Sequence, residues 1–457
     1  MTAGADRTSR NFGSSFRLWR VAWGESFQWT TDVKTTRTLV FLLAAALLSG
    51  CASSAETQDV GTPDTLWQQA NVVKEGKPWV VGVGDSFMSG EAGRWASNGT
   101  DNASFGQNGG WLLGTIEEVY GDGVDYTESI PACHRSATAP MFVGGDVNHA
   151  NLACSGAMTE SFVNDFGNAK PGLDFTATTT GDGQVVEGQA TQLQEFAATR
   201  EVSTVVMSIG GNDMGFADII SQCVSGWVSG KPCRDSDFIA PRVNPAVKKV
   251  ITARVVRAIE NVNAAMTRAG KAPSSWRLLV QLPPSPVPSS NEIDVDDSAF
   301  NRQAVGGCGM LDADLDFANE KLLPYLDEII GDAVRTSRKS ASNAAVTVVD
   351  MEKALDGHRL CEKGTQRPPA GIGIPPDEFG QGVEWVRFIS VVAADVVPDS
   401  PETQESLRPN YFGQRALASC MTLARETAVT TREVSCRPGS PLTFGEQALP
   451  SMELDSK

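Results

Sequence analysis

A glycine or polar residue stands shortly after each of three apolar runs in this sequence. The pairs are Trp79–Val83 with Ser86, Val147–Ala153 with Gly156, and Thr204–Ile209 with Asn212. A serine hydroxyl, a glycine N–H and an asparagine amide that converge supply a nucleophile and an oxyanion hole. The sequence therefore predicts a site for nucleophilic attack on a carbonyl carbon.

These residues converge only if the apolar runs are parallel strands of one sheet. Their continuous apolar character is typical of strands buried on both faces. Two further candidate strands are Arg277–Leu282 and Ala345–Val349, and helical stretches are Gln189–Ala198, Ala246–Ala269 and Asp312–Ser337. Strand and helix alternation at this spacing favours a parallel sheet covered by helices on both faces, with the ligand site at the carboxyl ends of the strands.

The Gly84–Ser86 segment alone is also typical of an ordinary turn, since glycine, aspartate and serine form turns in many contexts. The motifs that follow the next two candidate strands make a catalytic interpretation more specific, because Gly156 ends the second strand and Gly210–Asp213 ends the third. Additional motifs are Ser89–Glu91, Cys133–Ser136, Gly357–Cys361 and Pro409–Gln414. On this ordered set the chain resembles the SGNH (GDSL) hydrolase superfamily, close to secreted actinobacterial esterases and lipases, over residues 78–424.

The resemblance implies an α/β fold, a three-layer α/β/α sandwich with a parallel, flavodoxin-like sheet and disulfide-stapled long loops. It also implies ester hydrolysis with Ser86 as the nucleophile. The oxyanion hole would consist of the N–H groups of Ser86 and Gly156 and the side chain of Asn212. The expected substrate is an ester or acyl-containing small molecule, lipid or glycan.

The last motif departs from the family pattern. A histidine that acts as the base is expected immediately before Pro409, often with an aspartate three residues earlier, and this chain has Arg408 and Glu405 at those positions. Arginine stays protonated and has no acceptor nitrogen, so it cannot take the proton of the serine. General base catalysis contributes roughly 10²- to 10⁴-fold in rate.

No other residue is a convincing base. His134 and His358 lie beside cysteines in matched segments and are interpreted as local hydrogen-bonding or cleft residues, and His149 is expected at the opposite edge of the sheet. Glu405 next to Arg408 is expected to have a lowered pKa, which makes a carboxylate a poorer base.

Three interpretations therefore stay open. The chain is an ester hydrolase with an unconventional base, or a non-catalytic ligand-binding protein that uses the cleft of Ser86, Asn212 and Arg408. That trio suits a carboxylate or phosphate better than a neutral ester. In the third interpretation Arg408 is an isolated change in an active enzyme, because one nucleotide separates some histidine and arginine codons.

The N-terminal region predicts export. Lys34 and Arg37 precede the apolar run Leu39–Leu48, which is too short to span a bilayer and is typical of a signal peptide. The run Leu48–Cys51 resembles a bacterial lipobox, which predicts lipidation at Cys51 and a membrane anchor on the extracellular face. An ordinary signal peptide is the alternative, and Val33 is the expected initiator.

The resulting domain prediction has four parts. They are residues 1–50 as an N-terminal extension and lipoprotein signal peptide, 51–77 as a tether, 78–424 as the hydrolase domain and 425–457 as a C-terminal tail. Long loops at 89–146 and 285–310 are interpreted as walls of the substrate cleft.

Eight cysteines remain after Cys51, and an even number in an exported chain indicates disulfides. Spacing alone does not select among the pairings. The family resemblance implies Cys133–Cys154, Cys223–Cys233 and Cys308–Cys361, which leaves Cys420–Cys436.

Composition narrows the classes of partner. The net charge of −17 argues against nucleic acid and against an anionic membrane surface as a binding partner. With three histidines and no Cys-x-x-Cys spacing, no structural metal site is predicted. The chain has no phosphate-cradling glycine loop, so no cofactor is predicted either.

Overall fold

The computed structural model describes residues 73–96, 111–122, 128–296, 298, 301–340, 343–366, 371–372, 377–390, 404–445 and 449–456. The signal segment, the lipidation site predicted at Cys51 and most of the tether lie outside these residues. In the described part, no helix is long and apolar enough to cross a membrane.

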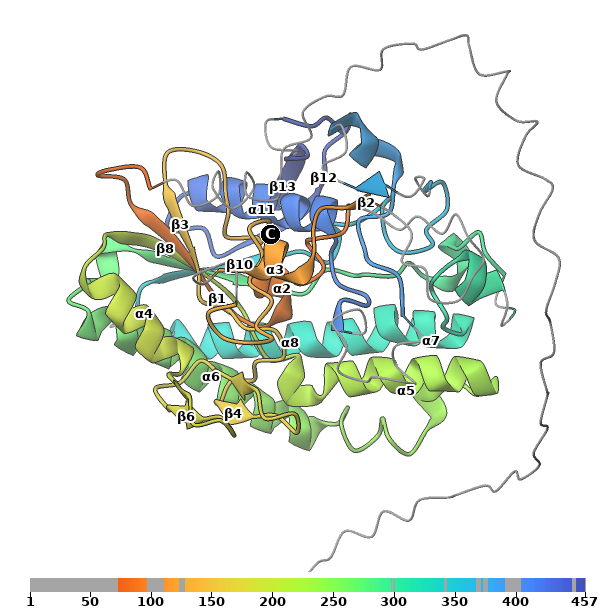
Figure 1. Cartoon of the computed structure of the whole chain (residues 1–457), viewed down its shortest axis with the longest axis horizontal. Helices are drawn as coiled ribbons and strands as arrows, with labels where there is room; N and C mark the ends of the chain where they lie inside the picture. The colour runs from red at the N-terminus through yellow and green to blue at the C-terminus, as the bar shows by residue number, and fades with distance from the viewer. Residues whose placement is uncertain are drawn as a thin grey trace, which may run out of the picture. The chain divides into compact units, whose positions relative to one another are not determined.

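The described residues contain a seven-stranded sheet with the order β13-β12-β10-β9-β8-β1-β3 (Figure 1). Its strands are β1 (Trp79–Gly84), β3 (Asn148–Asn151), β8 (Val202–Ser208), β9 (Arg277–Gln281), β10 (Ala345–Asp350), β12 (Glu433–Pro438) and β13 (Met452–Ser456). All pairings in it are parallel except that of β12 with β13.

The order of the five predicted strands is the flavodoxin-like one. The second of them, β3, lies outside the first, β1, and the third to fifth, β8, β9 and β10, follow on the other side of β1. Each of these strands forms within a few residues of its predicted bounds. The predicted α/β class with a mostly parallel sheet flanked by helices is therefore confirmed.

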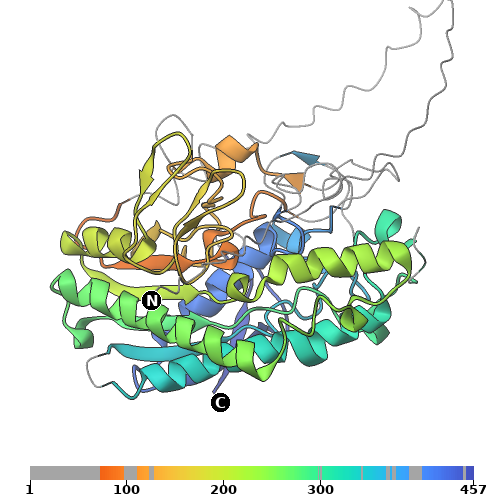
Figure 2. The ribbon, with the colours of Figure 1, turned by 90° about the horizontal axis from the view of Figure 1, so that it is seen from below.

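Helices cover both faces of the sheet. Figure 1 shows α4 (Gln189–Ala198), α6 (Pro245–Arg268) and α8 (Leu323–Ser337) on one side and α11 (Tyr411–Glu426) on the other. Figure 2 shows α6 between α4 and α8. The other α-helices among the described residues are α2 (Ser86–Ser89), α3 (Ile116–Tyr120), α5 (Phe216–Ser229) and α7 (Asp312–Phe317). Short strands form three separate pairs: β2 (Trp111–Leu112) with β11 (Gly371–Ile372), β4 (Phe162–Val163) with β5 (Ala169–Lys170), and β6 (Thr178–Thr179) with β7 (Val185–Val186).

The helix predicted over 312–337 is divided. A π-helical segment, Ala318–Leu322, separates α7 from α8, and Pro324 stands in the first turn of α8. Proline lacks an N–H and its ring clashes with the carbonyl four residues earlier, so regular α-helical bonding is interrupted at this point.

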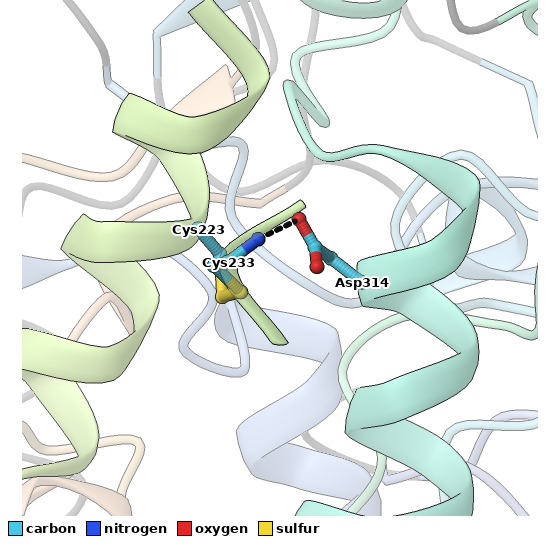
Figure 3. Close-up of side chains that lie close together, drawn as sticks. All are labelled: Cys223, Cys233 and Asp314. Carbon is cyan, nitrogen blue, oxygen red and sulfur yellow. Dashed lines mark hydrogen bonds between the residues drawn. A yellow bond between two sulfur atoms is a disulfide. The ribbon is translucent and has the colours of Figure 1, made fainter. Parts of the chain in front are cut away.

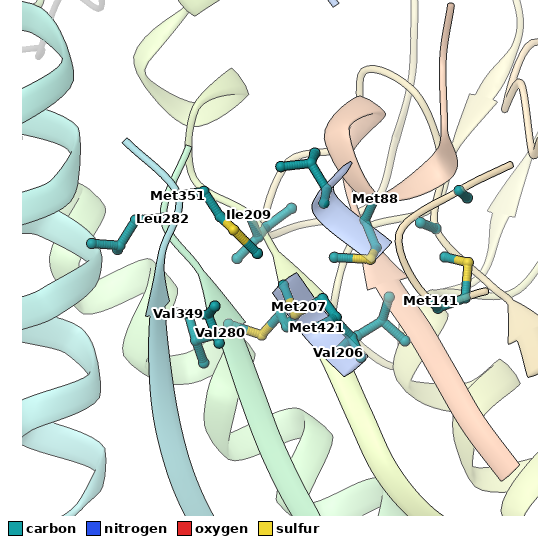
Figure 4. Close-up of a cluster of buried hydrophobic side chains, with 14 of the residues drawn as sticks. Met88, Met141, Val206, Met207, Ile209, Val280, Leu282, Val349, Met351 and Met421 are labelled. Carbon is teal, nitrogen blue, oxygen red and sulfur yellow. The ribbon is translucent and has the colours of Figure 1, made fainter. Parts of the chain in front are cut away.

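The core lies between the sheet and the helices on each side. Figure 4 shows Met207, Val280 and Val349 of adjacent strands with Met88 of α2 and Met421 of α11. All five side chains are fully or almost fully buried. Because unbranched methionines adapt to irregular gaps, they fill the space between a twisted sheet and short helices.

Residues 425–457, which the sequence analysis assigns to a C-terminal tail, contribute two strands to the main sheet. In β12 the buried Val434 and Cys436 alternate with less buried polar residues, which is the pattern of a strand with one face in the core. A disulfide joins Cys436 to Cys420 of α11. The prediction of a separate tail is therefore corrected, and the signal that could have revealed β12 is this short alternation.

The structure contains the three disulfides that the family resemblance implies and the fourth that they leave. They are Cys133–Cys154, Cys223–Cys233, Cys308–Cys361 and Cys420–Cys436. The first of them, Cys133–Cys154, joins the loop before β3 to the loop after it. Its two cysteines directly precede His134 and Ser155, which both contact Glu91 in the site described below.

Candidate active site

Ser86 begins α2 immediately beyond the carboxyl end of β1. Asp85 caps this helix by accepting a hydrogen bond from the N–H of Phe87 at 3.2 Å and one from Ser208 Oγ at 3.1 Å. Gly84 has a φ of +132°, and a Cβ there would lie 1.8 Å from the carbonyl oxygen of Ser208. The glycine is therefore required for the turn that places Ser86 between β1 and β8.

Arg408 occupies the side of Ser86 where a base is expected. Its Nε donates a hydrogen bond of 2.9 Å to Ser86 Oγ, and the same Nε lies 3.3 Å from Glu91 Oε2. Both Ser86 and Arg408 are buried. The guanidinium holds the serine oxygen as an acceptor, and it has no lone pair with which to remove the serine proton.

None of the three histidines, all of which lie in the described residues, is within hydrogen-bonding distance of Ser86 Oγ. His134 Nδ1 lies 2.7 Å from Glu91 Oε1, His149 Nε2 donates to the carbonyl of Val143, and His358 Nδ1 donates to that of Val383. Burial lowers the pKa of His149 to about 4 and lowers that of His358 as well. These positions agree with the local roles that the sequence analysis gives to the three residues.

Glu405 is buried away from the Arg408 guanidinium. Its carboxylate accepts hydrogen bonds from Arg94 Nε (2.6 Å) and Nη2 (2.9 Å), from Trp95 Nε1 (2.8 Å) and from Tyr120 OH (2.6 Å). The sequence analysis places Glu405 where an aspartate would orient the base. The structure corrects this assignment, because Arg94 and Trp95 after α2 and Tyr120 of α3 supply the donors for this carboxylate.

Glu91 is the acidic residue that contacts Arg408, and sequence reasoning missed its role. Its Oε1 accepts from Ser155 Oγ at 2.7 Å and contacts His134 at the same distance. Burial raises the pKa of Glu91, but the hydrogen bond and charge of His134, with Arg408 and Ser155, hold it below its ordinary value overall. Burial lowers the pKa of His134, and Glu91 raises it above the usual range overall. The pair is therefore a buried ion pair beside the serine.

The two remaining oxyanion candidates reach the same region. Gly156 has a φ of +76° and lines the same cleft as Asn212 and Arg408. Asn212 begins the turn after β8, and its Nδ2 donates to the carbonyl of Ala157 at 2.8 Å. That bond fixes the Asn212 side chain against the loop of Gly156 and leaves the second Nδ2 hydrogen for a ligand.

Two cavities meet at Asn212 and Arg408. One is a wide cleft of about 580 Å³, partly open to solvent. The other is a narrow recess between α2, α5 and α8, with room for little more than a water molecule. Among the described residues, the wide cleft is lined by parts of 155–170, by α5 and by parts of 389–408, and the predicted loop walls contribute only Glu91. Of the predicted walls, the described residues of 285–310 do not line this cleft, and those of 89–146 line it only at Glu91, while residues 97–110, 123–127, 297, 299 and 300 lie outside the described part of the chain.

One group of possible metal ligands occurs in the described part of the chain. Cys223, Cys233 and Asp314 have their ligand atoms within 4.8 Å of one another (Figure 3). The two sulfurs form a disulfide, and Asp314 accepts hydrogen bonds from the backbone N–H groups of Cys233 and Arg234. With no thiolate free to coordinate an ion, these contacts tie α5 to α7 and serve a structural purpose.

Comparison with known proteins finds likeness in three-dimensional structure. The extracellular lipase of Streptomyces rimosus shares 17% identity over 77% of this chain and 100% of its own, with a TM-score of 0.34. Phospholipase A1 of Streptomyces albidoflavus NA297 shares 16% over 77% and 100%, with a TM-score of 0.36. Est24, a carbohydrate acetylesterase of Sinorhizobium meliloti, shares 13% over 76% and 99%, with a TM-score of 0.29.

At these identities the likeness concerns the fold alone, and TM-scores this low add no support for a shared activity. No family model matches the chain, and no curated protein matches it. The chemistry of the site therefore has to follow from the positions of its own residues.

We expect Glu405→Gln to lower the free energy of unfolding by about 3–5 kcal/mol, because it removes the charged member of a buried ion pair that Arg94, Trp95 and Tyr120 all donate to. Chemical denaturation measures the change. Glu453→Gln is the matched control, since Glu453 pairs with Arg437 at an exposed site and its loss should cost less than about 1 kcal/mol. Equal effects of the two substitutions would contradict a structural role for Glu405.

Asp85 gives a prediction about pH. Burial raises the pKa of Asp85 from 3.8 to about 7, so the folded state favours the protonated carboxyl. The Asp85 carboxyl should therefore contribute a loss of stability as pH rises from about 4 to about 7 and no further loss above that range. Asp85→Asn retains an acceptor for the helix cap and lacks this titration.

The free energy of unfolding of Asp85→Asn minus that of the parent should accordingly grow between these pH values, by an amount on the order of a few kcal/mol. Denaturation curves of both proteins across this range test the expectation. A difference that does not change with pH would show that the carboxyl of Asp85 is ionised throughout.

Proposed function

We propose that this chain is an exported member of the SGNH hydrolase superfamily whose cleft recognises carboxylic esters and the acids they release. In this proposal Ser86, Gly156 and Asn212 retain the positions of nucleophile and oxyanion hole. Arg408 suppresses turnover at Ser86, so the protein acts as a binding protein built on an ester-hydrolase site.

The hydrogen bond from Arg408 Nε to Ser86 Oγ carries this proposal. A hydrolase needs an acceptor at this position to take the serine proton, and the chain provides a donor that stays charged. The convergence of Ser86, Gly156 and Asn212 at one edge of the sheet supports recognition of a carbonyl group.

Export is supported by the four disulfides, since such bonds persist in oxidising compartments. The lipidation of Cys51 and the resulting attachment to the extracellular face of the cell membrane belong to the same proposal. They rest on the sequence pattern at Leu48–Cys51 alone.

One observation favours a second candidate, slow ester hydrolysis by the unaltered chain. Glu91 Oε2 contacts the same Arg408 nitrogen that holds Ser86, and it makes no hydrogen bond to a described residue. If a bound ligand draws the guanidinium away, Glu91 is the carboxylate nearest to the vacated position. In that case turnover depends on Glu91 in the parent protein.

We expect Arg408→His to raise hydrolysis of short-chain p-nitrophenyl esters by roughly 10²-fold or more, because an imidazole at this position can accept the serine proton. Arginine Nε and histidine Nε2 lie the same number of bonds from Cβ, so the imidazole can reach Ser86 Oγ. Steady-state kinetics of the secreted, disulfide-bonded protein measure the effect.

Ser86→Ala in the Arg408→His background should return the rate to that of the parent. A parent that already turns over, loses activity with Ser86→Ala and gains nothing from Arg408→His would overturn the proposal. Loss of that parental activity in Glu91→Gln would then establish the second candidate.

Glu91 should orient the imidazole in the Arg408→His protein, because Glu91 and not Glu405 contacts side chain 408. Adding Glu91→Gln should lower kcat by about 10²-fold or more, as expected when the carboxylate partner of a catalytic imidazole is lost. Adding Glu405→Gln should affect stability and change kcat only a few-fold in the folded fraction. The opposite ranking would restore Glu405 to the role predicted from sequence.

A further inference from the structure

The outer end of the Arg408 guanidinium has no partner in the described part of the chain. Nε is engaged by Ser86 and Glu91, and neither Nη1 nor Nη2 makes a hydrogen bond to a described residue. The side chain is 90% buried, with 10% of its surface exposed, and Arg408 lines the wide cleft. Because the Nη1 and Nη2 N–H groups of this charged side chain are not used within the described part of the protein, they can form charge-assisted hydrogen bonds with an anion that enters the cleft.

The charges around Arg408 favour a ligand with a single negative charge. Glu91 offsets the charge of Arg408, and its contact with His134 raises the pKa of that histidine above its ordinary value. With His134 protonated, these three buried groups together carry one excess positive charge. Among the other cleft residues, Lys170 and Asp218 have opposite charges that offset each other. A single carboxylate bound to Nη1 and Nη2 of Arg408 would neutralise this excess positive charge.

The wall next to this anion position is one face of α5. The cleft residues of this helix recur with the spacing of a single helical face, and they are Ala217, Asp218, Ile220, Ser221, Val224, Ser225 and Val228. The stripe Ile220, Val224 and Val228 is apolar, and the side chain of Val228 is 62% exposed. At a rise of about 1.5 Å per residue the face is about 16 Å long.

Phe162 and Ile389 add apolar surface to the same cleft. A cation at one end and an apolar groove along the wall are complementary to an extended amphiphile with an anionic head. A neutral ester lacks the charge that the guanidinium end requires, and a phosphate monoester carries more charge than the site balances.

We propose that the cleft binds a free, single-chain fatty acid, with its carboxylate on Nη1 and Nη2 of Arg408 and its alkyl tail along Ile220, Val224 and Val228 of α5. This inference rests on the proposed function and names the ligand class of the same site. The bound acid corresponds to the product of an ester hydrolase, retained where the base would otherwise stand.

Isothermal titration calorimetry of the secreted, disulfide-bonded protein with dodecanoate below its micelle concentration tests the proposal. Dodecanoate should bind about 10-fold or more tightly than methyl dodecanoate, because the ester cannot accept charge-assisted bonds as strongly. Butanoate should bind about 100-fold or more weakly, because each methylene that leaves water contributes to affinity. Dodecyl phosphate should bind more weakly than dodecanoate.

Two variants locate the ligand. Arg408→Gln should weaken dodecanoate binding about 10-fold or more and remove the preference for the acid over its methyl ester. Val228→Asn should weaken dodecanoate binding about fivefold or more, since it puts a polar group on the tail groove. Val250→Asn is the matched control, because Val250 is 53% exposed on α6 and does not line the cleft, and it should leave binding within about twofold.

Equal affinity for the acid and its methyl ester would overturn the carboxylate assignment, and tighter binding of dodecyl phosphate would do the same. Equal effects of Val228→Asn and Val250→Asn would overturn the position of the tail. These failures are separable from failure of the proposed function. If dodecanoate does not bind and Arg408→His gains esterase activity, only the ligand inference falls. If dodecanoate binds as expected and Arg408→His stays inert, the inference of a disarmed hydrolase falls.

Discussion

A permanently charged guanidinium is buried at the carboxyl edge of the sheet, and the surrounding structure depends on how that charge is compensated. Burial of an unpaired charge is prohibitive, so Arg408 requires Glu91. Glu91 is itself fully buried, and it is in turn satisfied by His134 and Ser155. The buried charge of Arg408 therefore depends on residues from several segments of the chain.

The network continues from His134 to a second buried ion pair. Tyr120 stacks on His134 with a centroid distance of 4.9 Å and donates to Glu405, whose charge Arg94 balances. Glu405 and Arg408 are close in sequence but are bound by different partners on the segment that follows Ser86. Because the two carboxylates have separate cations, the charge at the serine depends on Arg408, Glu91 and His134, and on Asp85 once its carboxyl ionises.

The sequence was sufficient for the parts of the structure that local pattern determines. Apolar runs identified the five parallel strands, and the residues after three of them identified Ser86, Gly156 and Asn212 as neighbours at one sheet edge. Local pattern does not determine which distant groups pair. Arg94 and Glu405 are separated by 311 positions, and no spacing rule distinguishes Glu405 from Glu91 as the partner of side chain 408. The cleft walls were missed for a related reason, because only the packing of Phe216, Ile219 and Trp227 into the core decides which face of α5 lines the cleft.

The arrangement of residues around Glu91 depends on formation of the disulfide between Cys133 and Cys154. His134 and Ser155, the two residues that satisfy Glu91 Oε1, each directly follow one of its cysteines. Their convergence on one carboxylate oxygen is therefore linked to closure of that bond. Before oxidation the loops on either side of β3 lack the cross-link that holds both donors against Glu91. A newly made chain in a reducing compartment would thus lack the support for the buried charge of Arg408, and the ligand-binding state would be a property of the oxidised, exported protein.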